Sequence, residues 1–99
     1  MRKYVLLCSA GMSTSLLVTR MQEYANSIGY EVNIAAYPVA EAEMRGKDAD
    51  IVLLGPQVKF ALKKVKDLVK CPVECIPMKS YGIMDGKGVV DWAKGILGD

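Results

Sequence analysis

The chain alternates between short runs of consecutive apolar residues and longer stretches in which apolar residues recur every three or four positions. Two runs, residues 4–7 and 51–54, show no polar alternation, which is typical of strands that are covered on both faces. Residues 31–37 alternate between polar and apolar at first, and residues 71–77 are bracketed by prolines, which favours strands at or near a sheet edge. We therefore expect four strands, of which the first and third are central.

The stretches between these runs predict helices, because their apolar residues fall on one face. Ser13 or Thr14 can cap the first helix, and Gly29 ends it. Residues 39–46 favour a short second helix because good helix formers dominate there. The inward-facing residues that we expect are Leu17, Met21, Tyr24, Ala25 and Ile28 in the first helix, Val58, Ala61, Leu62, Val65, Leu68 and Val69 in the third, and Val89, Ala93, Ile96 and Leu97 in the last, with Val90 and Trp92 flanking.

Alternating strands and helices predict an α/β fold, in which residues 1–99 form one domain with a four-stranded parallel sheet and helices on both faces. Two central and two edge strands fit the strand order 2-1-3-4. The first strand then lies beside the point at which the strand order reverses, where ligands bind in open α/β sheets. The turns at residues 55–57 and 78–82 open on the same edge.

Composition narrows the range of partners. Thirteen Lys plus Arg against eleven Asp plus Glu give a net charge of +2, which is too small to indicate nucleic acid. No apolar run approaches the roughly 20 residues that cross a bilayer, so we expect a cytoplasmic domain with no membrane insertion. We also expect a monomer. The clustered lysines read as the solvated face of a helix: Lys59, Lys63, Lys64 and Lys66.

The chain contains three cysteines and no histidine. An odd number of cysteines does not make a disulfide framework and suits a reducing compartment. The lack of histidine excludes a His-containing zinc site, a Ser-His-Asp or Cys-His pair and a phosphohistidine on this chain. Cys71 and Cys75 have no further ligands at metal spacing, so packing is their expected role.

The first apolar run ends at Cys8, and small or hydroxyl residues follow it into the first helix. Where a strand leads through a tight loop into a helix, the backbone N–H groups of the loop point at one spot. The positive end of the helix dipole points there too, so the spot attracts an anion. We expect the Cys8 sulfur to lie unhindered at the lip of this loop, where a nucleophilic thiolate is favoured. A buried structural cysteine is the alternative. The candidate phosphate-binding loop comprises Ser9, Ala10, Gly11, Met12, Ser13, Thr14 and Ser15.

Two further residues are candidates for a supporting role or for partner contact. Tyr81 follows the fourth strand, so its hydroxyl is expected at the same edge as Cys8, although a tyrosine covering the last helix is the alternative. Gln57 follows the third strand. A functional role at this edge and a purely structural role are again the two alternatives. Met12 at the loop tip suits a partner surface or the core. Asp85 and Gly86 indicate a turn, although Asp85 could also orient a group near Tyr81.

Three segments carry a family resemblance: Cys8 to Val18, Asp50 to Val58, and residues 81–86. Together they closely resemble the IIB component of the sugar phosphotransferase system, lactose/cellobiose (chitobiose) family. The resemblance implies that the phosphohistidine of a IIA protein phosphorylates Cys8. It further implies that the phosphoryl group passes to a β-disaccharide of the cellobiose or chitobiose class held by the membrane component IIC, with no metal or organic cofactor.

The fold and the loop also resemble those of low-molecular-weight tyrosine phosphatases, in which an arginine six positions after the cysteine grips the phosphate. That position is Thr14 here. Without the arginine fork, and without a histidine base to activate water, a thiophosphate is held but poorly hydrolysed, which favours a carrier. Two alternatives remain: a small cysteine-dependent phosphatase, and a non-catalytic anion-binding regulatory module.

Overall fold

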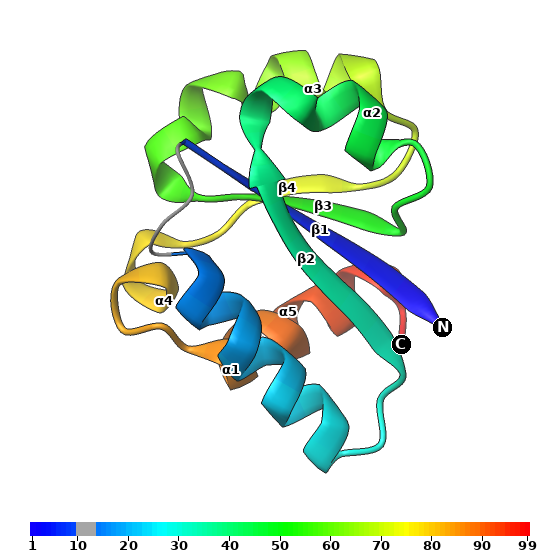
Figure 1. Ribbon diagram of the computed structural model, residues 1–99, viewed down its shortest axis with the longest axis vertical. Coiled ribbons are helices and arrows are strands. Elements are labelled where there is room, and N and C mark those ends of the chain that lie inside the picture. The colour runs from blue at the N-terminus through cyan, green and yellow to red at the C-terminus, as the bar shows by residue number, and fades with distance from the viewer. Residues whose placement is uncertain (10–13) are drawn as a thin grey trace.

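The computed structural model describes residues 1–9 and 14–99, which form a three-layer α/β arrangement (Figure 1). A parallel sheet lies in the middle, and helices cover both of its faces, as the sequence predicted. The predicted strand order, with the first and third strands central, is confirmed. The strands are β1 (Arg2–Cys8), β2 (Val32–Pro38), β3 (Ile51–Leu54) and β4 (Val73–Cys75), in the order β2-β1-β3-β4.

Helices on the two faces come from different parts of the chain. In Figure 1, α1 and α5 lie on one side of the sheet, α2 and α3 lie on the other, and α4 stands close to the start of α1. Two 3₁₀ segments, η1 and η2, lead into α2 and α3. The bounds are α1 (Thr14–Ser27), η1 (Val39–Glu41), α2 (Ala42–Gly46), η2 (Pro56–Ala61), α3 (Leu62–Leu68), α4 (Met78–Gly82) and α5 (Gly86–Leu97).

Alternate residues of β1 enter two separate hydrophobic clusters. Tyr4 and Leu6 pack on the side of α1 and α5, whereas Val5 and Leu7 pack on the side of α2 and α3. All four are completely buried, because successive side chains of a strand point to opposite faces. This burial on both faces explains why the run has no polar alternation.

The expected helix faces are largely confirmed, with local differences. Leu17, Met21 and Ala25 are buried in α1, but Ile28 is 43% exposed because α1 ends at Ser27, and Gly29 adopts a left-handed φ of 69°. In α5, Val90 is fully buried rather than flanking. The remaining expected inward residues of α5 are Val89 and Ala93, which are buried, and Ile96 and Leu97, which are partly buried.

The third predicted helix is only partly α-helical. Residues Pro56–Ala61 form the 3₁₀ segment η2, in which Val58 has the non-helical angles φ −116° and ψ 23°. The α-helix begins at Leu62. A proline and the neighbouring Gly55 at the start favour a tight turn over an α-helix. The prediction of a turn at residues 78–82 is also wrong, because these residues form the short helix α4.

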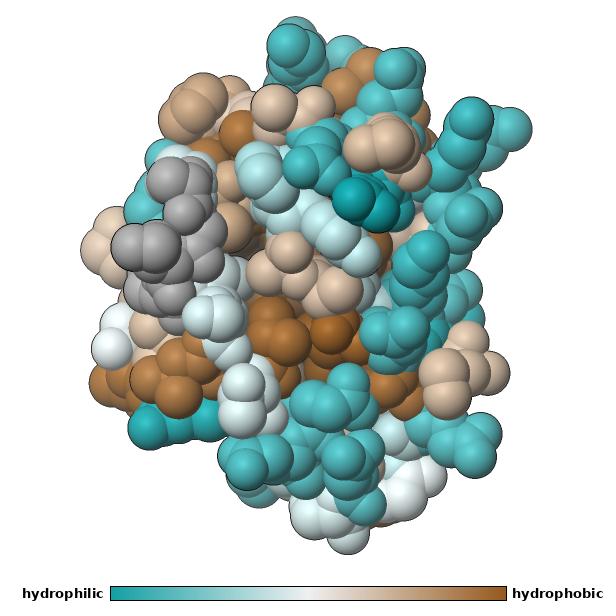
Figure 2. Space-filling model, in the orientation of Figure 1, coloured by the Kyte–Doolittle hydropathy of each residue, from teal (hydrophilic) through white to brown (hydrophobic). Residues whose placement is uncertain are grey.

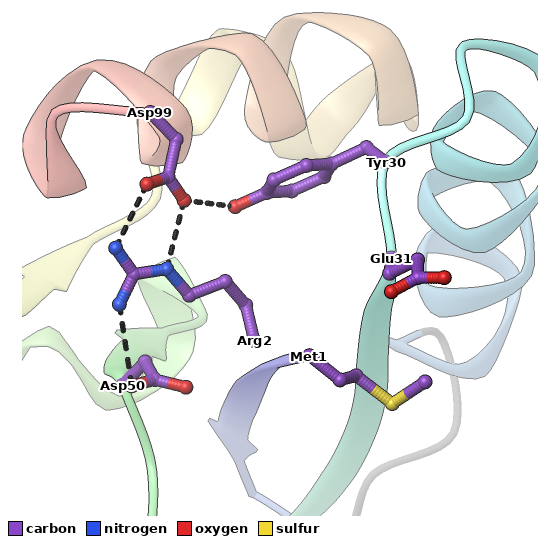
Figure 3. A pocket seen from close by; sticks show the side chains of 6 residues that line it. All are labelled: Met1, Arg2, Tyr30, Glu31, Asp50 and Asp99. Atoms are coloured by element: carbon purple, nitrogen blue, oxygen red, sulfur yellow. Dashed lines mark hydrogen bonds and ion pairs between the residues drawn. The ribbon is translucent and has the colours of Figure 1, made fainter.

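The amino ends of the strands carry a cluster of charges (Figure 3). Arg2 donates to both carboxylate oxygens of Asp99, at 2.9 and 2.8 Å, and its other nitrogen lies 3.4 Å from Asp50. The Tyr30 hydroxyl donates to Asp99 at 2.6 Å. These side chains, together with Met1 and Glu31, line an open pocket of about 440 Å³. It lies at the opposite end of β1 from Cys8.

The surface drawn in Figure 2 has a band of hydrophobic residues across its middle, between hydrophilic residues above and below. In the part of the chain that the structure describes, no helix is long and apolar enough to span a membrane.

Candidate functional site

Cys8 is the last residue of β1, and its neighbours in the sheet are asymmetric. The β1–β2 register extends to Cys8, which pairs with Pro38, whereas the β1–β3 register stops one residue earlier, where Leu7 pairs with Leu54. The carboxyl end of a central strand next to a reversal of strand order is therefore occupied by a cysteine, as the sequence predicted.

The sulfur is covered in this structure. Cys8 is 2% exposed, and its thiol donates a weak hydrogen bond to the backbone carbonyl of Tyr37 at 3.7 Å. The expectation of an unhindered sulfur is therefore wrong for this structure. A thiolate has no proton to donate, so this hydrogen bond exists only while Cys8 is a thiol.

Thr14 and Tyr81 meet beside this end of the sheet. Their hydroxyl oxygens are 3.1 Å apart, and Thr14 is 1% exposed. Thr14 is the first residue of α1, and its hydroxyl bonds across the molecule to a residue of α4. This pair ties α4 to the start of α1, 67 residues away in the sequence.

Tyr81 has a second role in packing. Its ring belongs to the hydrophobic cluster on the α1 and α5 side, and Tyr81 is 7% exposed. The ring therefore packs in the core while the hydroxyl reaches Thr14, and a role of this hydroxyl toward a phosphoryl group or a partner stays a prediction. At 7% exposure it offers little surface to a partner.

Gly55 joins the ends of β1 and β3. Its N–H donates to the Leu7 carbonyl at 2.8 Å. A Cβ added at Gly55 would lie 2.6 Å from Oε1 of Gln57 and 3.6 Å from Cε2 of Tyr81. Gln57 is exposed. The turn after β3 and the helix after β4 therefore open on the same edge as Cys8, as predicted.

The structure describes only some of the remaining candidate residues of the loop. Ser9 and Ser15 are exposed and flank the segment. Ala10, Gly11, Met12 and Ser13 lie outside the described residues, so the predicted amide cradle and the partner role of Met12 stay predictions.

The other two cysteines lie just before β4 and at its end. Cys71 and Cys75 are partly buried, and burial raises the pKa of both thiols, which keeps them protonated and unreactive near neutral pH. Among residues 1–9 and 14–99, no three His, Cys, Asp or Glu side chains are grouped closely enough to hold a metal. Asp85 caps α5 by accepting from the N–H of Gly88 at 2.9 Å, which agrees with its reading as a turn residue.

The sequence did not reveal two of these contacts. The Tyr37 carbonyl is a backbone group, so no residue type marks it as the partner of the thiol. The Thr14–Tyr81 bond joins residues of separate helices, and the 3.6-residue period carries no information about contacts between helices.

Comparison with known proteins gives consistent results. Residues 3–91 match the family model described as PTS system, lactose/cellobiose specific IIB subunit. Over 100 residues the chain is 46% identical to the PTS system oligo-beta-mannoside-specific EIIB component of Bacillus subtilis, covering 98% of this chain and 97% of that protein. Over 100 residues it is 37% identical to the cellobiose-specific EIIB component of Lactococcus lactis subsp. lactis, with 93% of each covered. The galactose-specific component of Lactococcus lactis subsp. cremoris gives the same values.

Solved structures agree in fold. The solution structure of the cellobiose-specific IIB component of Borrelia burgdorferi aligns with a TM-score of 0.81 at 34% identity, covering 98% of this chain and 92% of that chain. The lactose-specific IIB domain of Streptococcus pneumoniae aligns with a TM-score of 0.80 at 17% identity, with 93% of each covered, and shows the fold alone. The chain belongs to the lactose/cellobiose family of IIB components of the sugar phosphotransferase system.

Proposed function

We propose that this chain is a cytoplasmic phosphoryl carrier, acting as one IIB domain over residues 1–99, with Cys8 as the residue that becomes phosphocysteine. The donor is the phosphohistidine of a IIA protein, and the acceptor is a sugar held by the membrane component IIC. One observation carries the proposal: in a chain of this family that has no histidine, a cysteine ends the central strand just before a helix begins.

The chemistry is two displacements at phosphorus. The Cys8 sulfur attacks the phosphorus, an S–P bond forms, and the P–N bond to the donor imidazole breaks, so the imidazole leaves with the electron pair and takes up a proton. In the second step a sugar hydroxyl attacks, loses its proton, and the S–P bond breaks to regenerate the thiolate. The loop from Ser9 to Ser15 holds the phosphoryl oxygens through backbone N–H groups and hydroxyls.

Thr14 and Tyr81 act as positioning residues in this proposal. Their hydroxyls already bond to one another, and the contact fixes the first residue of α1 against α4. Because the loop ends where α1 begins, the helix start must be held for the loop to keep its shape. Gln57 is exposed on the same edge and suits contact with a partner.

Access to the sulfur is a required step. Cys8 is 2% exposed and its thiol is hydrogen-bonded to Tyr37, so docking of the IIA protein must uncover the sulfur and displace that hydrogen bond. A cover of this kind also protects phosphocysteine from water between the two transfers.

The sugar belongs to the class of β-linked disaccharides, with cellobiose or chitobiose as the named candidates. The relatives carry the names oligo-beta-mannoside, galactose and cellobiose, so similarity to these proteins does not select one sugar. In this proposal the membrane component that holds the sugar performs the selection.

Mass spectrometry tests the proposal. After incubation with phosphoenolpyruvate, the general phosphotransferase proteins and a IIA component, we expect a mass increase of about 80 Da, the mass of one transferred phosphoryl group, located on Cys8. The adduct should resist alkali and be lost with iodine. Cys8→Ser should fold normally and gain no adduct, whereas Cys71→Ser and Cys75→Ser should be phosphorylated like the parent.

Other results would favour the alternatives. Steady release of phosphate from an aryl phosphate, lost in Cys8→Ser, would identify a phosphatase. The absence of any adduct, together with phosphate binding, would leave the anion-binding module. Unfolding of Cys8→Ser at ordinary temperature would make the cysteine structural.

A further inference from the structure

A groove lies between α2 and α3, and none of the residues assigned to the phosphoryl relay lines it. It consists of two adjoining hollows of about 430 and 680 Å³, and Glu43 and Leu68 line both of them. One end is lined by Phe60 of η2, which follows the carboxyl end of β3, and the other by Lys70, which precedes β4. The groove therefore runs along one face of the molecule from the Cys8 end of the sheet toward the opposite end.

The groove is apolar and open. Phe60 is 83% exposed, Met44 is 60% exposed and Leu68 is 37% exposed, although all three line it. Contiguous large apolar side chains on a surface mark interaction sites, because their exposure to water is unfavourable. Gly46 makes the shape possible, since a Cβ there would lie 2.5 Å from Cγ1 of Val69. α2 can thus approach the end of α3 closely.

The rim of the groove carries more positive than negative side chains. Lys47, Lys64 and Lys70 line it against the single carboxylate of Glu43, and none of these four forms an ion pair with any residue of 1–9 or 14–99. The neighbouring Arg45, by contrast, is paired with Glu41 at 2.8 Å. Further exposed lysines stand on the same segment, at positions 59, 63 and 66.

We propose that this groove docks an amphipathic helical segment of a protein partner, with apolar side chains that fill the floor and carboxylates that meet the lysine rim. Helix-in-groove binding uses this combination of apolar anchors and complementary charge. An anionic membrane fits less well, because the apolar surface is concave and Glu43 lies within it. A helix in the groove contacts the α2 and α3 face, so docking there is separable from contact with Cys8.

The test is a titration of ¹⁵N-labelled protein with a synthetic helical peptide of about five turns, bearing leucines on one face and glutamates on the other. A matched peptide has lysine at every glutamate position. We expect the acidic peptide to shift the amide signals of α2, η2 and α3, to bind more weakly as salt is raised, and to bind better than the basic peptide.

Variants locate the binding. Phe60→Ser should weaken binding of the acidic peptide about tenfold by removing an anchor, and the double variant Lys47→Glu with Lys64→Glu should reverse the preference toward the basic peptide. Ile83→Ser is the matched control, because Ile83 is 62% exposed but does not line the groove. Circular dichroism checks that each variant is folded.

Three outcomes would overturn the proposal. The first is that the groove amide signals do not shift at a peptide concentration of about 1 mM, which would mean a dissociation constant weaker than about 1 mM. The second is equal binding of the two peptides. The third is perturbation of these residues by phosphatidylglycerol vesicles but not by the peptide, which would assign the surface to a membrane.

Discussion

The two ends of the sheet are stabilised by different kinds of interaction. At the amino end, Arg2 is bonded to Asp99 and Asp50, and Tyr30 adds a hydrogen bond to Asp99 (Figure 3). At the carboxyl end of β1, two contacts join neutral groups: the hydroxyls of Thr14 and Tyr81, and the thiol of Cys8 with a backbone carbonyl. Charged groups follow at the end of β2, where Arg45 lies over the ring of Tyr37 and pairs with Glu41.

The difference matches what each end must do in the proposed relay. At the amino end, the ion pair of Arg2 with Asp99 holds the two ends of the described chain together. A phosphoryl group at the carboxyl end brings its own negative charge, so neutral hydrogen-bond donors receive it without repulsion from fixed carboxylates. We therefore expect the ionic cluster to contribute to stability, and the Cys8 end to receive the anion in the proposed relay.

The largest effect is expected from a substitution in the close contact between α5 and α1. It tests whether close packing, rather than charge, holds α1 in its place beside Cys8. A Cβ at Gly86, at the start of α5, would lie 2.5 Å from the backbone carbonyl carbon of Arg20 and 2.7 Å from the backbone nitrogen of Met21. Gly86→Ala should therefore lower the free energy of unfolding by about 1–3 kcal/mol, as overpacking does, and slow phosphorylation of Cys8. Urea unfolding and the mass assay measure the two effects.

The control for this substitution lies in the same helix. A Cβ at Gly95 meets nothing within 4 Å, so Gly95→Ala should raise the free energy of unfolding by about 0.5–1 kcal/mol through helix propensity. Equal destabilisation by both substitutions would mean that α5 tolerates no alanine for reasons other than contact with α1.

A smaller effect is expected from the hydroxyl pair. Tyr81→Phe leaves the buried Thr14 hydroxyl without this partner, so we expect a loss of about 1 kcal/mol in the free energy of unfolding and slower transfer with Cys8 intact. Tyr24→Phe is the control, because it removes an exposed hydrogen bond to Asp91 and should cost less. Transfer at the parent rate in Tyr81→Phe would exclude a positioning role.

The smallest effect concerns acid stability. Hydrogen bonds from Arg2 and then Tyr30 lower the pKa of Asp99 to about 2, from an ordinary value of 3.8. The folded protein thus favours the carboxylate, and this stabilisation is present above pH 3.8 and is lost as the pH falls toward 2. Asp99→Asn should show a smaller drop in its urea midpoint between pH 5 and 2.5 than the parent.

Raising the salt concentration tests whether the ion pairs at the amino end contribute to stability. Exposed ion pairs are screened, so 1 M salt should reduce the difference between Asp99→Asn and the parent. The effect of Gly86→Ala should not change with salt. If salt altered both differences equally, the contrast between an ionic end and a packed end would be wrong.

The sequence predicted the fold well, for reasons that are visible in single elements. The unbroken apolar runs of β1 and β3 required cover on both faces, and both strands are central and buried. Gly29 ended α1 because a left-handed φ of 69° suits glycine. The prediction failed at η2 and α4, where a proline-led turn and a short helix have too few residues for a period to decide their form.

The sequence by itself determined that the first and third strands are central, that Cys8 ends the first, and that the chain has no histidine, because local pattern and composition settle these features. Tertiary structure alone decided that the sulfur is covered, that Thr14 meets Tyr81, and that α2 and α3 leave a lysine-rimmed groove. These features depend on distances between segments far apart in the chain, which are set by how the helices pack on the sheet and not by the period of any one segment.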